Sequence, residues 1–390
     1  MPKTFVLTPD SFKESMTAEQ ACQAMQRGIQ KVMPDARFIH VPMADGGEGT
    51  VDALIAAQGG KKIDCEVSGP LVTQKIKTYF GLVDEGKTAI IEMAKANGIH
   101  LLEPAQRNPL LTTTLGTGEM IKAALDLGVS KIIIGLGGSV TNDAGAGMAQ
   151  ALGAKFLNAG GCEVIVGGGQ LAQIKRIDFS ALDARLKQVD IVIASDVNNP
   201  LTGTQGASFV FAPQKGATAE MVKVLDHNLC YFADLIEQQL GIDCREIAGA
   251  GAAGGLGFGL MVFAGARIQS GVELMIEQTN LAEKIAQADY VLTGEGGIDF
   301  QTKFGKTPYG VAQVAKRLNK PVIAFAGMVS EGIEELYEEG FTQIIGINPP
   351  DYDLEDALKN AERHLEHAVV TTLSNLLEKA SDFFDEVHVE

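Results

Sequence analysis

The sequence has no tryptophan and only five cysteines, at positions 22, 65, 162, 230 and 244. An odd number of cysteines without a CxxC pair argues against a disulfide framework and against a zinc site. No apolar stretch is long enough to span a bilayer, and the first residues carry no basic and apolar targeting signal. We therefore expect a cytoplasmic protein that has no membrane partner.

Positive charge is also scarce. Lysine and arginine number 32 against 49 aspartates and glutamates, which gives a formal net charge of −17 at pH 7. Such an excess of negative charge disfavours binding to nucleic acids and to anionic membranes. It does not exclude a phosphate ligand, because a few local lysines and backbone dipoles can bind one anion.

The length of 390 residues predicts two or three domains, and the 45 glycines and 46% hydrophobic content are typical of an α/β protein. Short strands alternate with helices near both ends, whereas residues 75–93 have the pattern of an antiparallel hairpin. We predict a discontinuous, Rossmann-like doubly wound parallel sheet domain over 1–70 and 287–390. A second α/β domain, 71–286, is inserted into it. The oligomeric state stays open.

The run GLGGSVTNDAGAGM, residues 135–148, is the most informative stretch. It follows a β-branched strand at 131–134 and precedes a helix of small residues. Gly137 and Gly138 allow the backbone to approach a ligand closely, and Ser139, Thr141 and Asn142 add hydroxyl and amide donors. A turn of this kind before a helix favours phosphate or carboxylate binding, although the glycines can also serve packing alone. The next residue, Asp143, can cap the helix or hold a cation.

Several carboxylates follow predicted strands in glycine- or serine-flanked loops, and three lysines lie in comparable loops. Phosphoryl transfer uses these residue types, because it needs a carboxylate for Mg²⁺, a lysine for the developing charge and amides around the phosphates. Each residue alone can be a turn or cap residue. The carboxylates are Asp10, Asp45, Glu48, Asp143, Asp196, Glu295 and Asp299, and the lysines are Lys13, Lys215 and Lys306.

Two motif matches carry less weight. Residues 81–88 match a Walker A loop, but Asp84 and Glu85 stand in the phosphate cradle and a strand continues after it. Residues 249–254 match the GxGxxG dinucleotide fingerprint without a good strand before them. Helix packing or a ligand cleft explains those glycines better, so an NAD-dependent dehydrogenase is kept only as an alternative.

Seven segments together resemble the bacterial glycerate kinases of the type I family, and they cover about residues 3–375. The resemblance implies ATP-dependent phosphorylation of D-glycerate with Mg²⁺, usually at the 2-hydroxyl, with the active site in the cleft between the two domains. A 3-phosphoglycerate product, a kinase of another small hydroxy acid and a non-catalytic binding module remain alternatives. The segments are PDSFKES (9–15), ADGGEGT (44–50), TTTLGTGE (112–119), GGSVTNDAGAGM (137–148), SDVNNPL (195–201), GAGAAGGLG (249–257) and TGEGGIDFQTKFGKTP (293–308).

The resemblance suggests roles for individual residues. Asp196 and Lys13 are the predicted catalytic residues, with Asp196 either orienting the glycerate hydroxyl or holding Mg²⁺. Asp299 is the second predicted metal ligand. The predicted substrate contacts are Asp10, Ser11, Asp45 and Asn198, and the predicted nucleotide and phosphate contacts are Gly137, Gly138, Ser139, Thr141, Asn142, Glu295 and Lys306.

The chain departs from the family pattern at two positions. Ala144 stands where a second glycine is common, and we expect its methyl group to be tolerated if this residue is already helical. Gly297 replaces a residue that is often arginine, and if that arginine contacts phosphate in the relatives, Lys303 or Lys306 has to do so here.

Overall fold

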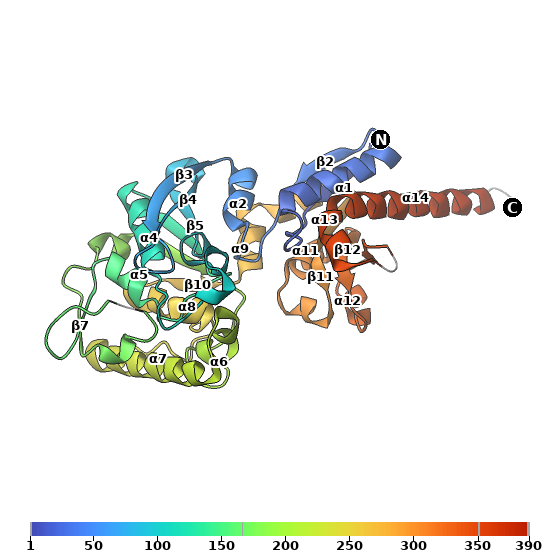
Figure 1. Cartoon of the computed structure of the whole chain (residues 1–390). Coiled ribbons are helices and arrows are strands. Elements are labelled where there is room, and N and C mark those ends of the chain that lie inside the picture. The colour runs from blue at the N-terminus through green and yellow to red at the C-terminus, as the bar shows by residue number, and fades with distance from the viewer. Residues whose placement is uncertain (1, 166, 350–351, 388–390) are drawn as a thin grey trace. The chain divides into compact units, whose positions relative to one another are not determined.

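The computed structural model describes residues 2–165, 167–349 and 352–387, with side chains up to Glu378. The chain folds as two compact units, and each is described separately. Unit 1 is Met1–Asp45 with Val272–Glu390, and unit 2 is Gly46–Gly271 (Figure 1).

These boundaries differ from the predicted ones for a reason visible in the packing. Residues 61–68 form a strand that pairs antiparallel with the next strand of unit 2, so they do not belong to the parent sheet. At the other end, Val272 packs against α11 of unit 1 (Thr307–Arg317), where a side chain on Gly310 would collide with its Cγ1 atom.

In unit 1 the described residues form a five-stranded parallel sheet in the order β13-β12-β11-β1-β2. After β1, the chain adds β2 on one side of it. Much later it adds β11, β12 and β13 in turn on the other side. This reversal is the topological switch point of a doubly wound sheet, where loops beyond the carboxyl ends of the strands form a ligand crevice. The fold-class prediction is confirmed. The strands are β1 (Thr4–Leu7), β2 (Arg37–His40), β11 (Tyr290–Ile298), β12 (Val322–Val329) and β13 (Gln343–Gly346).

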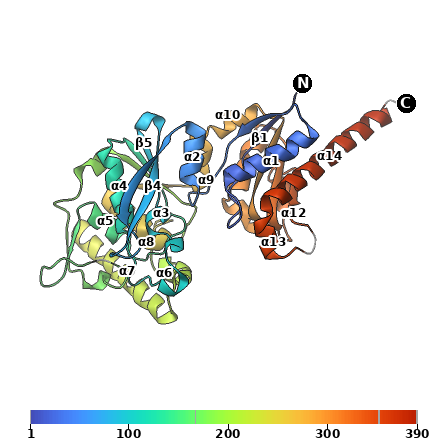
Figure 2. The ribbon, with the colours of Figure 1, turned by 45° about the horizontal axis from the view of Figure 1, so that its top comes forward.

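Helix α1 (Ala18–Val32) shows how the sequence builds this unit. Thr17 and Gln20 form the predicted capping box at its start. Its buried face, including Met25 and Ile29, packs on the sheet and on α14 (Ala361–Val387), which runs beside α1 in Figure 2. Removing this face from water stabilises the helix far more than its intrinsic propensity does. The remaining helices of unit 1 are α9 (Gly271–Gln278), α10 (Leu281–Ala286), α12 (Glu334–Glu338) and α13 (Leu354–Lys359).

Unit 2 contains a mixed six-stranded sheet over the described ranges, in the order β10-β9-β6-β5-β4-β3. Four neighbouring strands, β10, β9, β6 and β5, are parallel. Strands β5 and β4 form the predicted antiparallel hairpin, and β3 pairs antiparallel with β4 at the edge. Because Lys87 follows the turn of a hairpin between β4 and β5, the Walker A reading is excluded. The strands are β3 (Lys61–Ser68), β4 (Lys75–Val83), β5 (Thr88–Glu92), β6 (Lys131–Gly135), β9 (Asp190–Ala194) and β10 (Arg267–Gln269).

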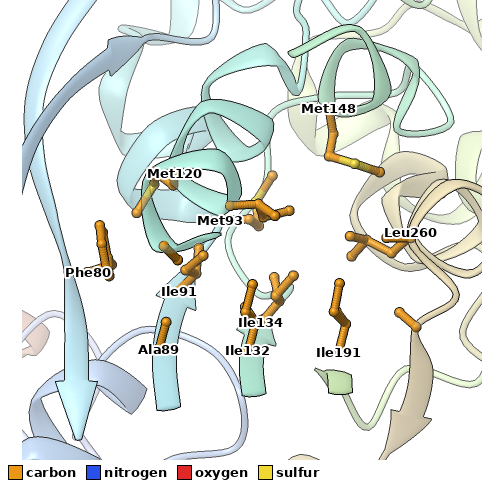
Figure 3. Packing of buried hydrophobic residues seen from close by; sticks show 14 of the residues in the cluster. Phe80, Ala89, Ile91, Met93, Met120, Ile132, Ile134, Met148, Ile191 and Leu260 are labelled. Atoms are coloured by element: carbon orange, nitrogen blue, oxygen red, sulfur yellow. The ribbon is translucent and has the colours of Figure 1, made fainter. Parts of the chain in front are cut away.

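Alternate residues of the central strands build the core of unit 2. Figure 3 shows Ile91 and Ile134 extending from β5 and β6 toward Met120 and Leu260, which belong to α4 and α8. Packing on this face fixes the register of the strands, since a shift by one residue would expose every apolar side chain. The helices of this unit are α2 (Thr50–Gln58), α3 (Ala94–Asn97), α4 (Leu115–Asp126), α5 (Ala146–Ala151), α6 (Ala207–Phe211), α7 (Ala219–Leu240) and α8 (Ala252–Ala264).

A second cluster lies beneath α7, where Phe156, Phe232 and Phe263 contact one another at ring-centroid distances of 5.5 to 6.4 Å. It is closed by the two-stranded sheet of β7 (Lys155–Leu157) and β8 (Arg176–Asp178). None of the helices in the described part of the chain has both the length and the apolar character needed to cross a membrane.

Candidate active site

The glycine loop after β6 is held by its neighbours while several of its amides stay available. Gly138 O accepts a hydrogen bond from Ile99 N at 2.8 Å, and Val140 N donates to Asn97 O at 3.1 Å. In the described part of the chain, the backbone N–H groups of Gly137, Gly138 and Ser139 donate to no acceptor. Consecutive unbonded amides in a loop with a positive-φ glycine, Gly138 at +75°, are the backbone arrangement that anion-binding nests use.

A second glycine segment, Gly46 and Gly47, packs directly against this loop. Gly46 lies between the ends of β6 and β9, and a Cβ atom on it would approach Ala194 O to 2.6 Å. A Cβ atom on Gly137 would similarly lie 2.7 Å from the Cα atom of Gly47. Side chains are therefore excluded here, and the ADGGEGT and GLGG segments meet backbone to backbone.

Asp143 fixes the far end of the loop. Its carboxylate is fully buried and accepts hydrogen bonds from Thr114 N and Oγ1 at 2.8 and 3.0 Å, and from Gly145 N and Gly147 N at 3.1 and 3.2 Å. Burial raises the pKa of this carboxyl group, and the four hydrogen bonds oppose that shift. Asp143 thus orders the start of α5, the first of the two roles that the sequence left open.

The condition stated for Ala144 is not met. Its φ angle is +53°, so it adopts the left-handed conformation and not the helical one. The loop accepts this strain because Gly255 and Gly259 of α8 pack directly on Ala144, leaving no room for another arrangement. The glycines of the GxGxxG match, residues 249–254, come just before them. No strand precedes them, and a Cβ atom on Gly254 would collide with Thr141 O, so they pack α8 against the loop.

The side chains of Thr141 and Asn142 are engaged with the protein. Both are fully buried. Thr141 Oγ1 donates to Ala253 O at 3.4 Å, and Asn142 Nδ2 donates to Ser208 Oγ at 3.0 Å. Ser139 Oγ accepts from Lys215 Nζ at 2.8 Å. The polar residues that were predicted as ligand donors therefore also stabilise the loop itself.

Asp196 lies at the same sheet edge as the glycine loop. Strands β6 and β9 are parallel, and Gly135 pairs with Ala194 at their ends. Gly137 and Asp196 each lie two residues after this pair. Neighbouring strands are about 4.8 Å apart, which makes the two loops adjacent. Asp196 is half-buried, and its Oδ1 accepts from Gly271 N at 3.1 Å. Asn198 is exposed further along the same loop.

Unit 1 has its own polar cluster at the switch point between β1 and β11. Asp10 N donates to Gly294 O at 2.8 Å. Its buried carboxylate accepts from Ser11 N and from Thr307 Oγ1, at 2.6 Å each. Burial and the negative charge of Asp45 raise the pKa of Asp10 to about 6. Lys13 is exposed in the next turn, and its charge opposes this shift.

Glu295 and Lys306 complete this cluster. Lys306 Nζ lies 3.5 Å from Glu295 Oε1 and 3.5 Å from Asp299 Oδ1, and it donates to Gly297 O at 3.1 Å. Burial raises the pKa of Glu295 to about 7, although the positive charge of Lys306 acts in the opposite direction. Among the residues that the structure describes, the buried Oε1 atom of Glu295 accepts no hydrogen bond, and its ion pair with Lys306 is long at 3.5 Å. Such a group is destabilising in the absence of a ligand and is typical of a functional site.

The predicted residues thus form two groups. Gly137, Gly138, Ser139, Thr141, Asn142, Asp196 and Asn198 lie in unit 2, whereas Asp10, Ser11, Lys13, Asp45, Glu295, Asp299 and Lys306 lie in unit 1. The predicted metal ligands Asp196 and Asp299 belong to different units. No cluster of three or more His, Cys, Asp or Glu side chains arranged to hold a metal ion occurs among the described residues. The sequence placed Lys215 among the loop lysines suited to phosphoryl transfer, but no local pattern signals that its side chain is buried.

The comparisons with known proteins agree with this architecture. The model of the Glycerate kinase family matches residues 5–377. The chain belongs to the glycerate kinase family. A glycerate kinase from Haemophilus influenzae is 51% identical over 361 residues, covering 93% of this chain and 95% of that protein. The glycerate 2-kinase of Escherichia coli K12 is 47% identical over 356 residues, covering 91% and 93%.

The glycerate kinase family is also represented among solved structures. A crystal structure from Salmonella typhimurium LT2, named for glycerate kinase 2, has a TM-score of 0.86 and 45% sequence identity. The match covers 98% of this chain and 100% of that one. The prediction that the protein is an enzyme of the glycerate kinase family is confirmed.

Proposed function

We propose that the protein transfers the γ-phosphoryl group of ATP to the 2-hydroxyl of D-glycerate. The observation that carries this proposal is the glycine loop, whose unbonded amides lie beside Asp196 at one edge of the unit 2 sheet. The product assignment is supported by the relative from E. coli that is named glycerate 2-kinase. The type I subgroup and a cytoplasmic location are further inferences from the sequence.

The amides of Gly137, Gly138 and Ser139 bind phosphate oxygens and stabilise charge that develops during transfer. Mg²⁺ is usually held by one or two carboxylates together with phosphate oxygens and water, so a large acidic cluster is not required. Lys306 already lies between Glu295 and Asp299 as their cation, and this disfavours the metal role predicted for Asp299. Asp196 is the carboxylate that fits. Bound there, Mg²⁺ would neutralise phosphate charge.

The switch-point cluster of unit 1 supplies the other contacts. Lys306 and Glu295 engage the nucleotide, and Asp10, Ser11, Lys13 and Asp45 engage glycerate, with Lys13 neutralising its carboxylate. A carboxyl group that titrates near pH 6, as Asp10 does, can donate or accept a hydrogen bond at a substrate hydroxyl. The reaction needs groups from both units, so we propose that substrates draw the units together and exclude water during transfer.

A coupled assay for ADP tests this function, with D-glycerate, L-glycerate and other small 2-hydroxy acids as acceptors. D-Glycerate should give the highest kcat/KM, and phosphorus NMR of the product should show 2-phosphoglycerate. Faster turnover of another hydroxy acid would contradict the substrate, and a 3-phosphoglycerate signal would contradict the position. Binding of NAD without ATP turnover would favour the dehydrogenase alternative.

A further inference from the structure

Lys215 is a buried lysine that the proposed reaction does not use. It ends the short 3₁₀ turn Pro213–Lys215 and is only 1% exposed. Its Nζ atom donates to Ser139 Oγ at 2.8 Å and to Thr141 O at 2.7 Å. Burying an ammonium group is costly unless its hydrogen bonds are satisfied, so a fully buried lysine calls for a specific explanation.

The two contacts of Lys215 hold the glycine loop at Ser139 and at Thr141. A serine hydroxyl has one hydrogen and two lone pairs. Because Ser139 Oγ accepts from the lysine, its own hydrogen remains available to a ligand and is polarised by the ammonium group. The bond to Thr141 O fixes the orientation of the peptide that follows it. Lys215 therefore determines the positions of loop donors that the ligand would use.

The charge around Lys215 supports an electrostatic contribution as well. Burial lowers the pKa of Lys215 to about 7, and the carboxyl group of Asp143 opposes that shift. Asp143 anchors the same loop through Thr114, Gly145 and Gly147. The loop thus lies between a buried cation, which holds the carbonyl of Thr141, and a buried carboxyl group, which holds the amides of Gly145 and Gly147 just after the loop.

We propose that Lys215 is a positioning residue, which holds Ser139 and the 137–142 loop in the conformation that binds the phosphates of ATP. It acts through Ser139 and the loop backbone and does not touch the ligand. The proposal rests on the assignment of this loop to phosphate, but it is tested by nucleotide binding and not by turnover alone. If the unmodified protein has no glycerate kinase activity, the proposed function fails, but this test by nucleotide binding still applies.

The first experiment compares Lys215→Met with Lys223→Met, the same change at an exposed lysine of α7. Calorimetry with ADP should show an affinity loss of at least about tenfold for Lys215→Met and less than about twofold for Lys223→Met. In turnover assays, Lys215→Met should raise the KM for ATP much more than the KM for glycerate. ADP affinity equal to that of the unmodified protein, or equal rises in both KM values, would overturn the proposal.

The second experiment tests whether Lys215 acts through Ser139. In a double-mutant cycle, Ser139→Ala and Lys215→Met together should lose no more ADP affinity than the more damaging single change. Fully additive losses would contradict the proposal. Ser139→Ala also decides the matter if Lys215→Met fails to fold, because it removes the oxygen that the lysine holds. We expect it to fold normally and bind ADP at least about fivefold more weakly, and unchanged affinity would overturn the proposal.

Discussion

Replacing Glu295 with glutamine removes an ionisable group that unit 1 buries without fully compensating it. Burial raises the pKa of this carboxyl group from its ordinary value of 4.5 to about 7. The folded state therefore binds a proton more tightly than the unfolded chain does, and ionisation destabilises the fold. Below about pH 4.5 both states are protonated, so Glu295→Gln should have little effect on stability. The stability of the unmodified protein relative to the variant should then fall between pH 4.5 and 7 and stay constant above pH 7.

The magnitude follows from the same values. Each pH unit in that interval corresponds to about 1.4 kcal/mol, which gives an upper limit of about 3 kcal/mol above pH 7. This limit already includes the attraction of Lys306, whose Nζ atom lies 3.5 Å from Glu295 Oε1, and the buried amide of glutamine needs hydrogen bonds of its own. We therefore expect Glu295→Gln to raise the free energy of unfolding at pH 8 by about 1–2 kcal/mol.

Urea unfolding at several pH values, followed by circular dichroism without ligand, measures this difference, and Glu331→Gln is the exposed control in the same unit. Turnover should move in the opposite direction, with kcat/KM for ATP reduced at least about fivefold. A variant that is less stable at pH 8, or whose stability difference is the same at every pH, would refute the reasoning.

Three further predictions concern single loops and the whole chain. Lys87 is 62% exposed, so Lys87→Ala should leave the kcat/KM for ATP unchanged. Lys306→Ala should lower the kcat/KM for ATP at least about tenfold, and measuring both variants decides between the two sites. Gly138→Ala forces alanine into the left-handed conformation at φ +75° and should lower the free energy of unfolding in urea by about 1–2 kcal/mol. It should also raise the KM for ATP, and an unchanged KM would contradict the assignment of this loop to phosphate binding. X-ray scattering should give a smaller radius of gyration with an ATP analogue and glycerate than without them, and superimposable curves would contradict closure.

Local patterns were enough to predict the elements that surround the site. The capping box at Thr17, the hairpin at 75–93 and the strand before Gly137 are set by residues close in sequence, and each was found as predicted. Asp10 and Asp196 could be placed beyond strand ends for the same reason, because parallel strands bring their carboxyl ends to one edge. The prediction that Glu295 also follows a strand is wrong, because β11 continues to Ile298 and pairs Glu295 with Ala326.

Long-range contacts account for what the sequence did not predict. Ala144 is left-handed because α8 packs on it from more than a hundred residues away. The donors of Thr141 and Asn142 are engaged by Ala253 and Ser208, and Lys215 is buried by segments distant in the chain. No periodicity or motif reports such contacts, since they depend on how the elements pack.

The most direct test of the central claim is the turnover of Asp196→Asn beside that of Asp64→Asn, an exposed aspartate of the edge strand β3. We propose that the carboxylate of Asp196, beside the glycine loop, takes part in phosphoryl transfer. We predict that Asp196→Asn folds normally and loses at least about a hundredfold in kcat with D-glycerate and ATP. Asp64→Asn should keep normal turnover. A folded Asp196→Asn variant with near-normal kcat would show that the reaction takes place elsewhere in the molecule.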